Sequence, residues 1–176
     1  TALKPQIIKI YAQDQNDKLL ATVIYSSKYI LILMLMIGIP LLLNTDYILS
    51  IWLKEVPRYS SIFTKLVVLE SLFGMLQNIL WIVANATGNI KRSQLYGRLF
   101  TFMVFPISFL MLEFGIINNP VYIFAISVIA QIIYWLYSLF DIHKQVDLNY
   151  KDYFICGILP VVLSLIIVLP ITCHIV

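Results

Sequence analysis

The segment "DIHKQVDLNYKD", Asp141 to Asp152, holds the side chains best suited to chemistry, one histidine and three aspartates. Three residues separate His143 from Asp147, whereas the histidine–aspartate pattern of acyltransferases has four between them. The aspartates also lack the DxxD spacing that is used for magnesium–diphosphate chemistry. The pattern therefore predicts a solvated loop, and no catalytic residue is assigned.

The segment "ANATGNIKRSQ", Ala84 to Gln94, combines small residues, a glycine and two adjacent cations. It lacks the GxxxxGK[ST] spacing of a phosphate-binding loop and does not follow a strand. Two cations are too few to bind nucleic acid, because that binding needs several phosphate contacts. Cys156 and Cys173 lie in one apolar run without metal-ligand spacing. We therefore expect no nucleic-acid partner, no metal site and no cofactor.

Composition explains why so few side chains are available for chemistry. The chain is 61% hydrophobic and 12% charged, and its mean hydropathy is +0.91. Soluble domains carry roughly 25% charged residues. The long apolar runs do not alternate as membrane β-strands do, and a helix satisfies its own backbone groups in lipid. The sequence predicts an all-α integral membrane protein.

A transmembrane helix needs about 20 predominantly apolar residues. We predict five such helices, near residues 29–49, 62–84, 99–117, 121–140 and 153–172. Residues 1–28 precede them as a helix end, a polar break at Gln13 to Asp17 and an amphipathic lead-in. The first residues resemble the tail of an earlier element, so we expect a fragment of a longer chain.

Lysine and arginine accumulate in the cytoplasmic loops of membrane proteins. Nine cations belong to the N-terminal segment and to the loops after the second and fourth predicted helices: Lys4, Lys9, Lys18, Lys28, Lys91, Arg92, Arg98, Lys144 and Lys151. The opposite side has three: Lys54, Arg58 and Lys65. This asymmetry predicts a cytoplasmic N-terminus and a C-terminal end on the outer side.

The second predicted helix has one broad polar face, which includes Glu70, Gln77, Asn78 and Asn85. Glu70 lies near the centre of this helix, where an ionised carboxylate costs at least about 2.5 kcal/mol. It must therefore pair, face an aqueous cavity or stay protonated. Two interpretations remain open: a cavity-lining or proton-linked group, and a packing residue that is paired to a neighbouring helix.

Five segments occur in an order and spacing that resemble a known family: "LKPQIIKIYAQDQNDKL", "SSKYILILMLMIGIPLLL", "ILSIWLKEVPRYSSIF", "ANATGNIKRSQLYG" and "FPISFLMLEFG". This pattern is similar to the C-terminal half of Wzx-type polysaccharide flippases, which belong to the MOP (MATE-like) superfamily. The resemblance covers residues 2 to about 145, and residues 153–172 fit it more loosely.

The resemblance implies part of a MATE-like two-lobe transporter in the bacterial inner membrane. Its substrate would be an undecaprenyl-diphosphate-linked oligosaccharide for surface polysaccharide, and its partners would be membrane lipid and the remaining helices of its parent chain. It implies cavity or lobe-interior roles for Glu70, Gln77, Asn78 and Asn85. It also implies contact of a lipid headgroup or the substrate diphosphate with three cations: Lys91, Arg92 and Arg98. Neither a reaction nor a cofactor is implied.

Three other functions remain open. One is another MATE-like transporter, such as a multidrug or cation antiporter, which would have acidic rather than basic residues on the cavity-lining helices upstream. A second is a membrane-embedded polysaccharide transferase or polymerase, which would depend on single residues such as Asp141 or His143. The third is a purely structural membrane subunit.

Overall fold

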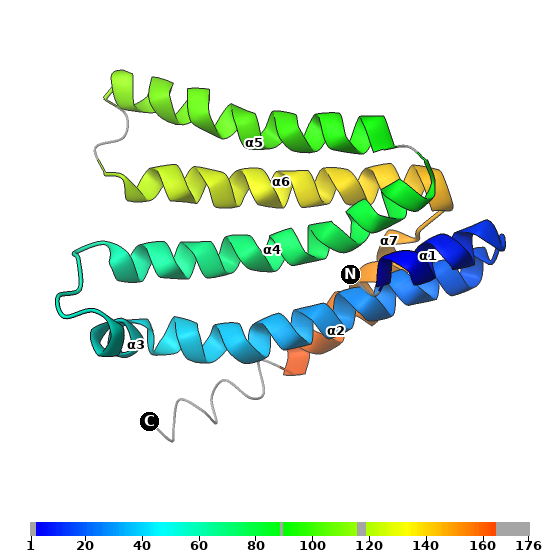
Figure 1. The fold of residues 1–176 in the computed structure, drawn as a ribbon, viewed down its shortest axis with the longest axis horizontal. Helices are drawn as coiled ribbons and strands as arrows, with labels where there is room; N and C mark the ends of the chain where they lie inside the picture. The colour runs from blue at the N-terminus through cyan, green and yellow to red at the C-terminus, as the bar shows by residue number, and fades with distance from the viewer. Residues whose placement is uncertain (1–2, 89, 116–118, 165–176) are drawn as a thin grey trace.

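The computed structural model describes residues 3–88, 90–115 and 119–164, without the side chains of residues 90–94 and 98 (Figure 1). These residues form helices and no strand, so the all-helical prediction is confirmed. The elements are α1 (Leu3–Ala12), α2 (Asn16–Leu43), α3 (Thr45–Trp52), α4 (Ser60–Ala86), α5 (Ile90–Glu113), α6 (Val121–Val146), α7 (Tyr150–Asp152) and the π-helix η1 (Tyr153–Ile158).

Among the described residues, four helices are long and apolar enough to cross a membrane: Asn16–Leu43, Ser60–Ala86, Leu95–Glu113 and Val121–Val146. This is the pattern of a multi-pass membrane protein. The fifth predicted helix, near 153–172, lies partly outside the described residues. Its described part begins with η1 and continues as α-helix to Ser164.

The first spanning helix differs from its prediction at both ends. The amphipathic lead-in and the apolar run form the single helix α2, which ends at Leu43 rather than near residue 49. Thr45 explains the break, because its hydroxyl donates to the Leu41 carbonyl at 2.5 Å and to the Leu42 carbonyl at 3.2 Å. A side-chain donor thereby takes the place of the backbone donors that helix C-terminal carbonyls lack. The chain then restarts as α3.

The long helices lie side by side in the order α5, α6, α4, α2 (Figure 1). Helices α4 and α6 run in the same direction, whereas α2 and α5 run opposite to them. The turn between α4 and α5 includes Gly88, whose φ is +80°. Glycine adopts this left-handed conformation at a helix end without a Cβ clash. Helix α4 is central and contacts both α6 and α2.

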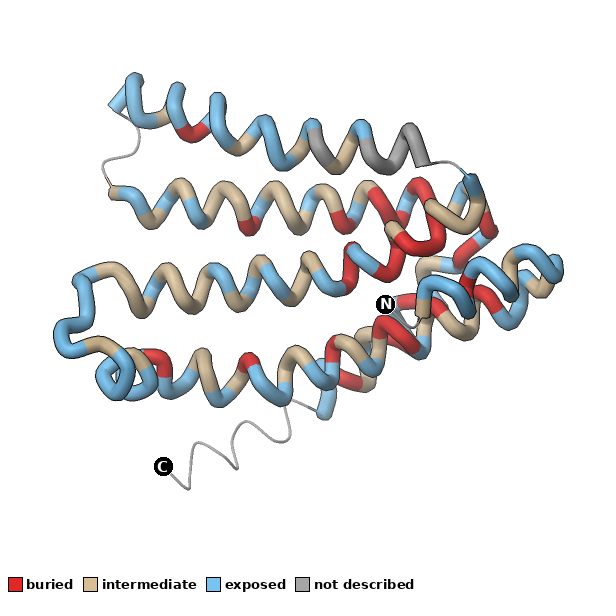
Figure 2. The backbone as a smooth tube through the Cα atoms, viewed as in Figure 1, coloured by how far each residue is buried: buried red, intermediate tan, exposed pale blue. Residues whose placement is uncertain are grey.

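Buried apolar side chains concentrate at one end of this row (Figure 2). There α1, η1 and the adjoining halves of α2, α4 and α6 meet. The cluster includes Ile7, Leu19, Val23, Leu80, Val83, Leu139, Ile142 and Tyr153. Tyr153 also donates its hydroxyl to Ser27 Oγ at 3.1 Å, which ties η1 to α2. Helix α5 lies at the edge, and Ser108 is the one buried residue among its described side chains.

The direction of the helices separates the basic residues into two groups. The nine cations predicted to be cytoplasmic lie on α1, α7 and the halves of α2, α5 and α6 nearest the buried cluster. The other three, Lys54, Arg58 and Lys65, lie toward the opposite end. The helices therefore provide two chemically different ends, and the side of the membrane that each end faces stays a prediction.

Gly97 allows α5 to approach α6 closely. A Cβ at this position would lie 2.4 Å from the Tyr134 hydroxyl oxygen and 2.7 Å from the adjoining ring carbon Cζ. We expect Gly97→Ala to have a lower free energy of unfolding than Gly74→Ala by about 1–3 kcal/mol, the usual effect of overpacking. The comparison cancels the helix propensity that alanine adds over glycine in both variants. Denaturant titration in micelles, followed by circular dichroism, measures this difference.

Gly74→Ala is the matched control for the Gly97 variant. A Cβ at Gly74 would meet Gln131 Nε2 at 3.7 Å, which is ordinary van der Waals contact. The loss at Gly97 should shrink in a Tyr134→Phe background, because the hydroxyl oxygen is the nearest obstacle. Equal stability of the Gly97→Ala and Gly74→Ala variants would show that α5 and α6 are not in close contact at Gly97.

Candidate functional site

Polar side chains join α4 to α6 at several depths. Ser127 Oγ donates to Glu70 Oε2 at 3.2 Å, and Gln77 Nε2 donates to Ser138 Oγ at 2.8 Å. The paired positions are 57 and 61 residues apart in sequence. This nearly constant offset follows from the parallel direction of the two helices. Side-chain hydrogen bonds of this kind stabilise helix association in membranes, by about 0.6 kcal/mol each on average.

The polar face of α4 is wider than its contact with α6. At about 100° per residue, Glu70, Gly74 and Gln77 fall within an arc of about 60°, and this arc faces α6. Ser71 and Asn78 project about 80° away and are exposed. The structure therefore divides the predicted face into a part that packs against α6 and a part that is uncovered.

Asn85 is the fourth of the predicted cavity or lobe-interior residues. It is half-buried, and its Nδ2 donates to the Trp81 carbonyl of the same helix at 2.7 Å. Gln77, in contrast, is buried and bonds across the helix interface. The candidates thus occupy three environments: Gln77 and Glu70 face α6, Asn85 folds back on α4, and Asn78 is exposed.

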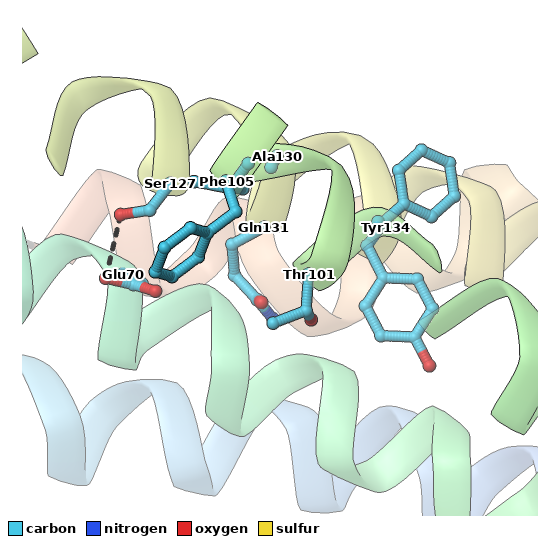
Figure 3. A pocket seen from close by; sticks show the side chains of 9 residues that line it. Glu70, Thr101, Phe105, Ser127, Ala130, Gln131 and Tyr134 are labelled. Carbon is cyan, nitrogen blue, oxygen red and sulfur yellow. Dashed lines mark hydrogen bonds between the residues drawn. The ribbon is translucent and has the colours of Figure 1, made fainter. Parts of the chain in front are cut away.

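A cavity of about 230 Å³ adjoins Glu70 between α4, α5 and α6 (Figure 3). Its polar lining residues include Glu70, Thr101, Ser127 and Gln131, and Tyr134 lies at one end with its hydroxyl pointing away from Glu70. Phenyl rings and aliphatic side chains form the rest of the wall. Glu70 therefore lines a cavity and is also hydrogen-bonded to a neighbouring helix, so it combines features of both interpretations of the sequence.

Sequence reasoning did not single out the polar residues that α5 and α6 contribute to this cavity. The signal on α6 is a helical one, because Ser127, Gln131, Tyr134 and Ser138 follow one another at steps of four, three and four residues. This is the same spacing that defines the polar face of α4. On α5, Gln94, Arg98, Thr101 and Ser108 follow at steps of four, three and seven residues, so a sparser helical signal of the same kind includes Thr101.

The prediction of a solvated loop from Asp141 onward is wrong at its start. Helix α6 continues to Val146, and Asp141 is buried with 4% exposure. Gln145 Nε2 donates to Asp141 Oδ2 at 2.7 Å, and Thr87 Oγ donates to Gln145 Oε1. His143 lies within hydrogen-bonding distance of the Leu148 carbonyl, at 2.7 Å from its Nδ1. These hydrogen bonds stabilise the C-terminal end of α6. The helix therefore continues through polar residues beyond the apolar run.

The three cations assigned to headgroup or diphosphate contact lie on α5. The side chains of Lys91, Arg92 and Arg98 are outside the described part of the structure. Their contact with an anionic group therefore stays a prediction. In the rest of the chain, no three histidine, cysteine, aspartate or glutamate side chains that the structure describes gather closely enough to hold a metal ion.

The length and hydropathy of four helices in the described part of the chain are those of a multi-pass helical membrane protein. Comparison with protein-family models, curated proteins and solved structures gives no match. The function is therefore argued from the residues and the geometry.

Proposed function

We propose that this chain is part of a MATE-like two-lobe transporter of the MOP superfamily. Its substrate would be an undecaprenyl-diphosphate-linked oligosaccharide, moved from the cytoplasmic to the outer leaflet of the bacterial inner membrane. The sequence resemblance supports the family assignment, and the four candidate spanning helices fit a membrane transporter.

The exposed polar stripe on α4, Ser71 and Asn78, is the observation that carries the proposal. These residues lie about 16 and 27 Å along the helix from Ser60, at 1.5 Å per residue. Both depths fall within a hydrocarbon core of about 30 Å that is centred on α4. An exposed amide at such a depth is unfavourable against lipid. The stripe is better explained by a water-filled path or a second lobe facing it.

The volume of the cavity beside Glu70 decides whether the cavity can hold the proposed substrate. Pockets for drug-sized ligands have about 300–1,000 Å³, and this cavity has about 230 Å³. It is too small for an oligosaccharide. We therefore assign the substrate path to the exposed stripe, and a supporting role in charge or proton exchange to Glu70.

The proposal is tested by complementation in a bacterium that lacks its polysaccharide flippase. The complete reading frame that encodes this chain should restore surface polysaccharide. Asn78→Leu should restore less, because it removes the exposed amide from the stripe. Met75→Leu is the matched control, since Met75 is an exposed apolar residue of the same helix. Immunoblots of membrane fractions correct for protein level.

Each outcome of complementation has a definite meaning. Absence of polysaccharide at normal protein level would contradict the proposed function. Restoration by Asn78→Leu equal to that by Met75→Leu would contradict the assignment of the stripe to the substrate path. Protection against cationic drugs without polysaccharide would favour the multidrug or cation antiporter.

A further inference from the structure

Helix α3 is a short amphipathic helix between two candidate spanning helices. It joins the C-terminal end of α2 to the segment that leads into α4, and it packs against both (Figure 1). Its axis is turned away from the common direction of the long helices. It therefore lies at the end of the helix row opposite the buried apolar cluster, at the level where α2 ends and α4 begins.

Three chemically distinct faces run along α3. Thr45 is buried and Leu49 half-buried, and at about 100° per residue they lie within about 40° of each other. Four large apolar side chains occupy an adjoining arc of about 140°: Tyr47, Ile48, Ile51 and Trp52. Asp46 and Ser50 lie on the other side and are exposed.

The apolar face of α3 is strongly exposed. Trp52 has 82% of its surface exposed, Ile51 has 70% and Tyr47 has 68%. In water, burial of such side chains would stabilise the chain by about 1.5–3 kcal/mol each. Burial of this apolar face against another apolar surface is therefore strongly favourable. Because the polar face lies opposite, the covering must leave Asp46 and Ser50 in contact with water.

We propose that α3 is an interfacial helix that lies in the surface of the bilayer and inserts Tyr47, Ile48, Ile51 and Trp52 among the lipids. Helices with this division of faces bury the apolar one about 5–10 Å into the headgroup and acyl boundary. Tyrosine and tryptophan favour that boundary, because their rings are apolar and their tips are polar. This inference concerns lipid alone and does not depend on the proposed transport.

Two neighbouring features favour lipid over a protein partner as the covering. Helix α2 presents exposed apolar side chains up to Leu43, so an apolar surface continues from a candidate spanning helix to α3. Lys54 lies two residues after α3 and Arg58 six residues after it; both are exposed, as is Glu55 between them, so the segment carries one net positive charge. Cations at this position can contact the phosphates of lipid headgroups.

Fluorescence quenching measures the depth of Trp52. The chain is reconstituted in vesicles whose lipids carry bromine either near the headgroup or near the end of the acyl chain. Subtracting the emission of Trp52→Phe from that of the unmodified chain isolates Trp52 from the other two tryptophans, the half-buried Trp81 and the buried Trp135. Trp52 should lose more intensity to the shallow bromine than to the deep one, and little to acrylamide in the water.

A tryptophan at position 36 is the depth control. Met36 is 74% exposed and lies on α2, about 10 Å along the helix from its end at Leu43. After subtraction of the Trp52→Phe emission, the Trp52→Phe, Met36→Trp double variant should therefore lose more intensity to the deep bromine. Quenching of Trp52 by acrylamide alone would place the apolar face in water and overturn the proposal. Quenching by none of the three agents would mean that protein covers it. Stronger quenching by the deep bromine would place α3 in the hydrocarbon core, which also contradicts an interfacial helix.

Discussion

Leu80→Ala is expected to lower the free energy of unfolding by about 2–5 kcal/mol, the range for a leucine removed from a packed core. Leu80 is fully buried on α4 and belongs to the apolar cluster that also contains Leu19 and Leu139. The removed methyl groups would leave a cavity that α2 and α6 cannot close without losing other contacts. Within a bilayer, helix association depends mainly on such packing contacts. Denaturant titration in micelles measures the change.

Leu33→Ala is the matched control for Leu80→Ala. Leu33 lies on α2 and is 59% exposed, so its truncation leaves no enclosed cavity and should change stability by less than about 1 kcal/mol. If the two variants lost similar stability, the exposed face of α2 would have to be buried in the folded protein. If Leu80→Ala cost nothing, the arrangement of α4 between α2 and α6 would be wrong.

Glu70→Gln is expected to reduce transport at least about tenfold with little effect on folding, if the chain acts in the proposed transporter. Glutamine keeps the length of the side chain and an oxygen that accepts from Ser127. It cannot carry a charge or exchange a proton. If Glu70 contributes about 1.4 kcal/mol or more to a transport step through its charge or its proton, its loss slows that step at least about tenfold. Surface polysaccharide in the complementation assay is the measured quantity.

Glu113→Gln provides the comparison for Glu70→Gln. Glu113 is the last residue of α5 and is exposed, so it tests the loss of a carboxylate outside the cavity. Its substitution should leave transport unchanged. Full transport by Glu70→Gln would show that Glu70 is a packing residue held by Ser127, the second interpretation of the sequence. A loss of folded protein in Glu70→Gln, seen in denaturant titration, would also favour that interpretation.

The class of fold could be predicted because it depends on local properties of the chain. The apolar runs are long enough to span a bilayer, and backbone hydrogen bonding in lipid leaves helix as the available structure. The polar break at Gln13 to Asp17 was likewise readable from local residue types, and the structure separates α1 from α2 there. These features need no knowledge of which helices become neighbours.

Helix ends were less predictable where side chains from elsewhere decide them. Asp141 follows an apolar run and resembles the start of a loop, yet Gln145 and Thr87 hold it in a buried helix end. At the end of α2, the Thr45 hydroxyl donates to the Leu41 and Leu42 carbonyls, which caps a helix end that the apolar run does not mark. In both cases, the helix end is set by hydrogen bonds of polar side chains rather than by the end of the apolar run.

The sequence by itself determined that the chain is helical, that most of its helices can span a membrane and that α4 has a polar face. Periodicity places residues on a helix face but does not say what covers that face. Only the tertiary structure decided that Glu70 and Gln77 face α6 while Asn78 is exposed. The physical reason is that the environment of a polar side chain in a membrane helix depends on which helix packs beside it. That neighbour is determined by the packing of the whole bundle.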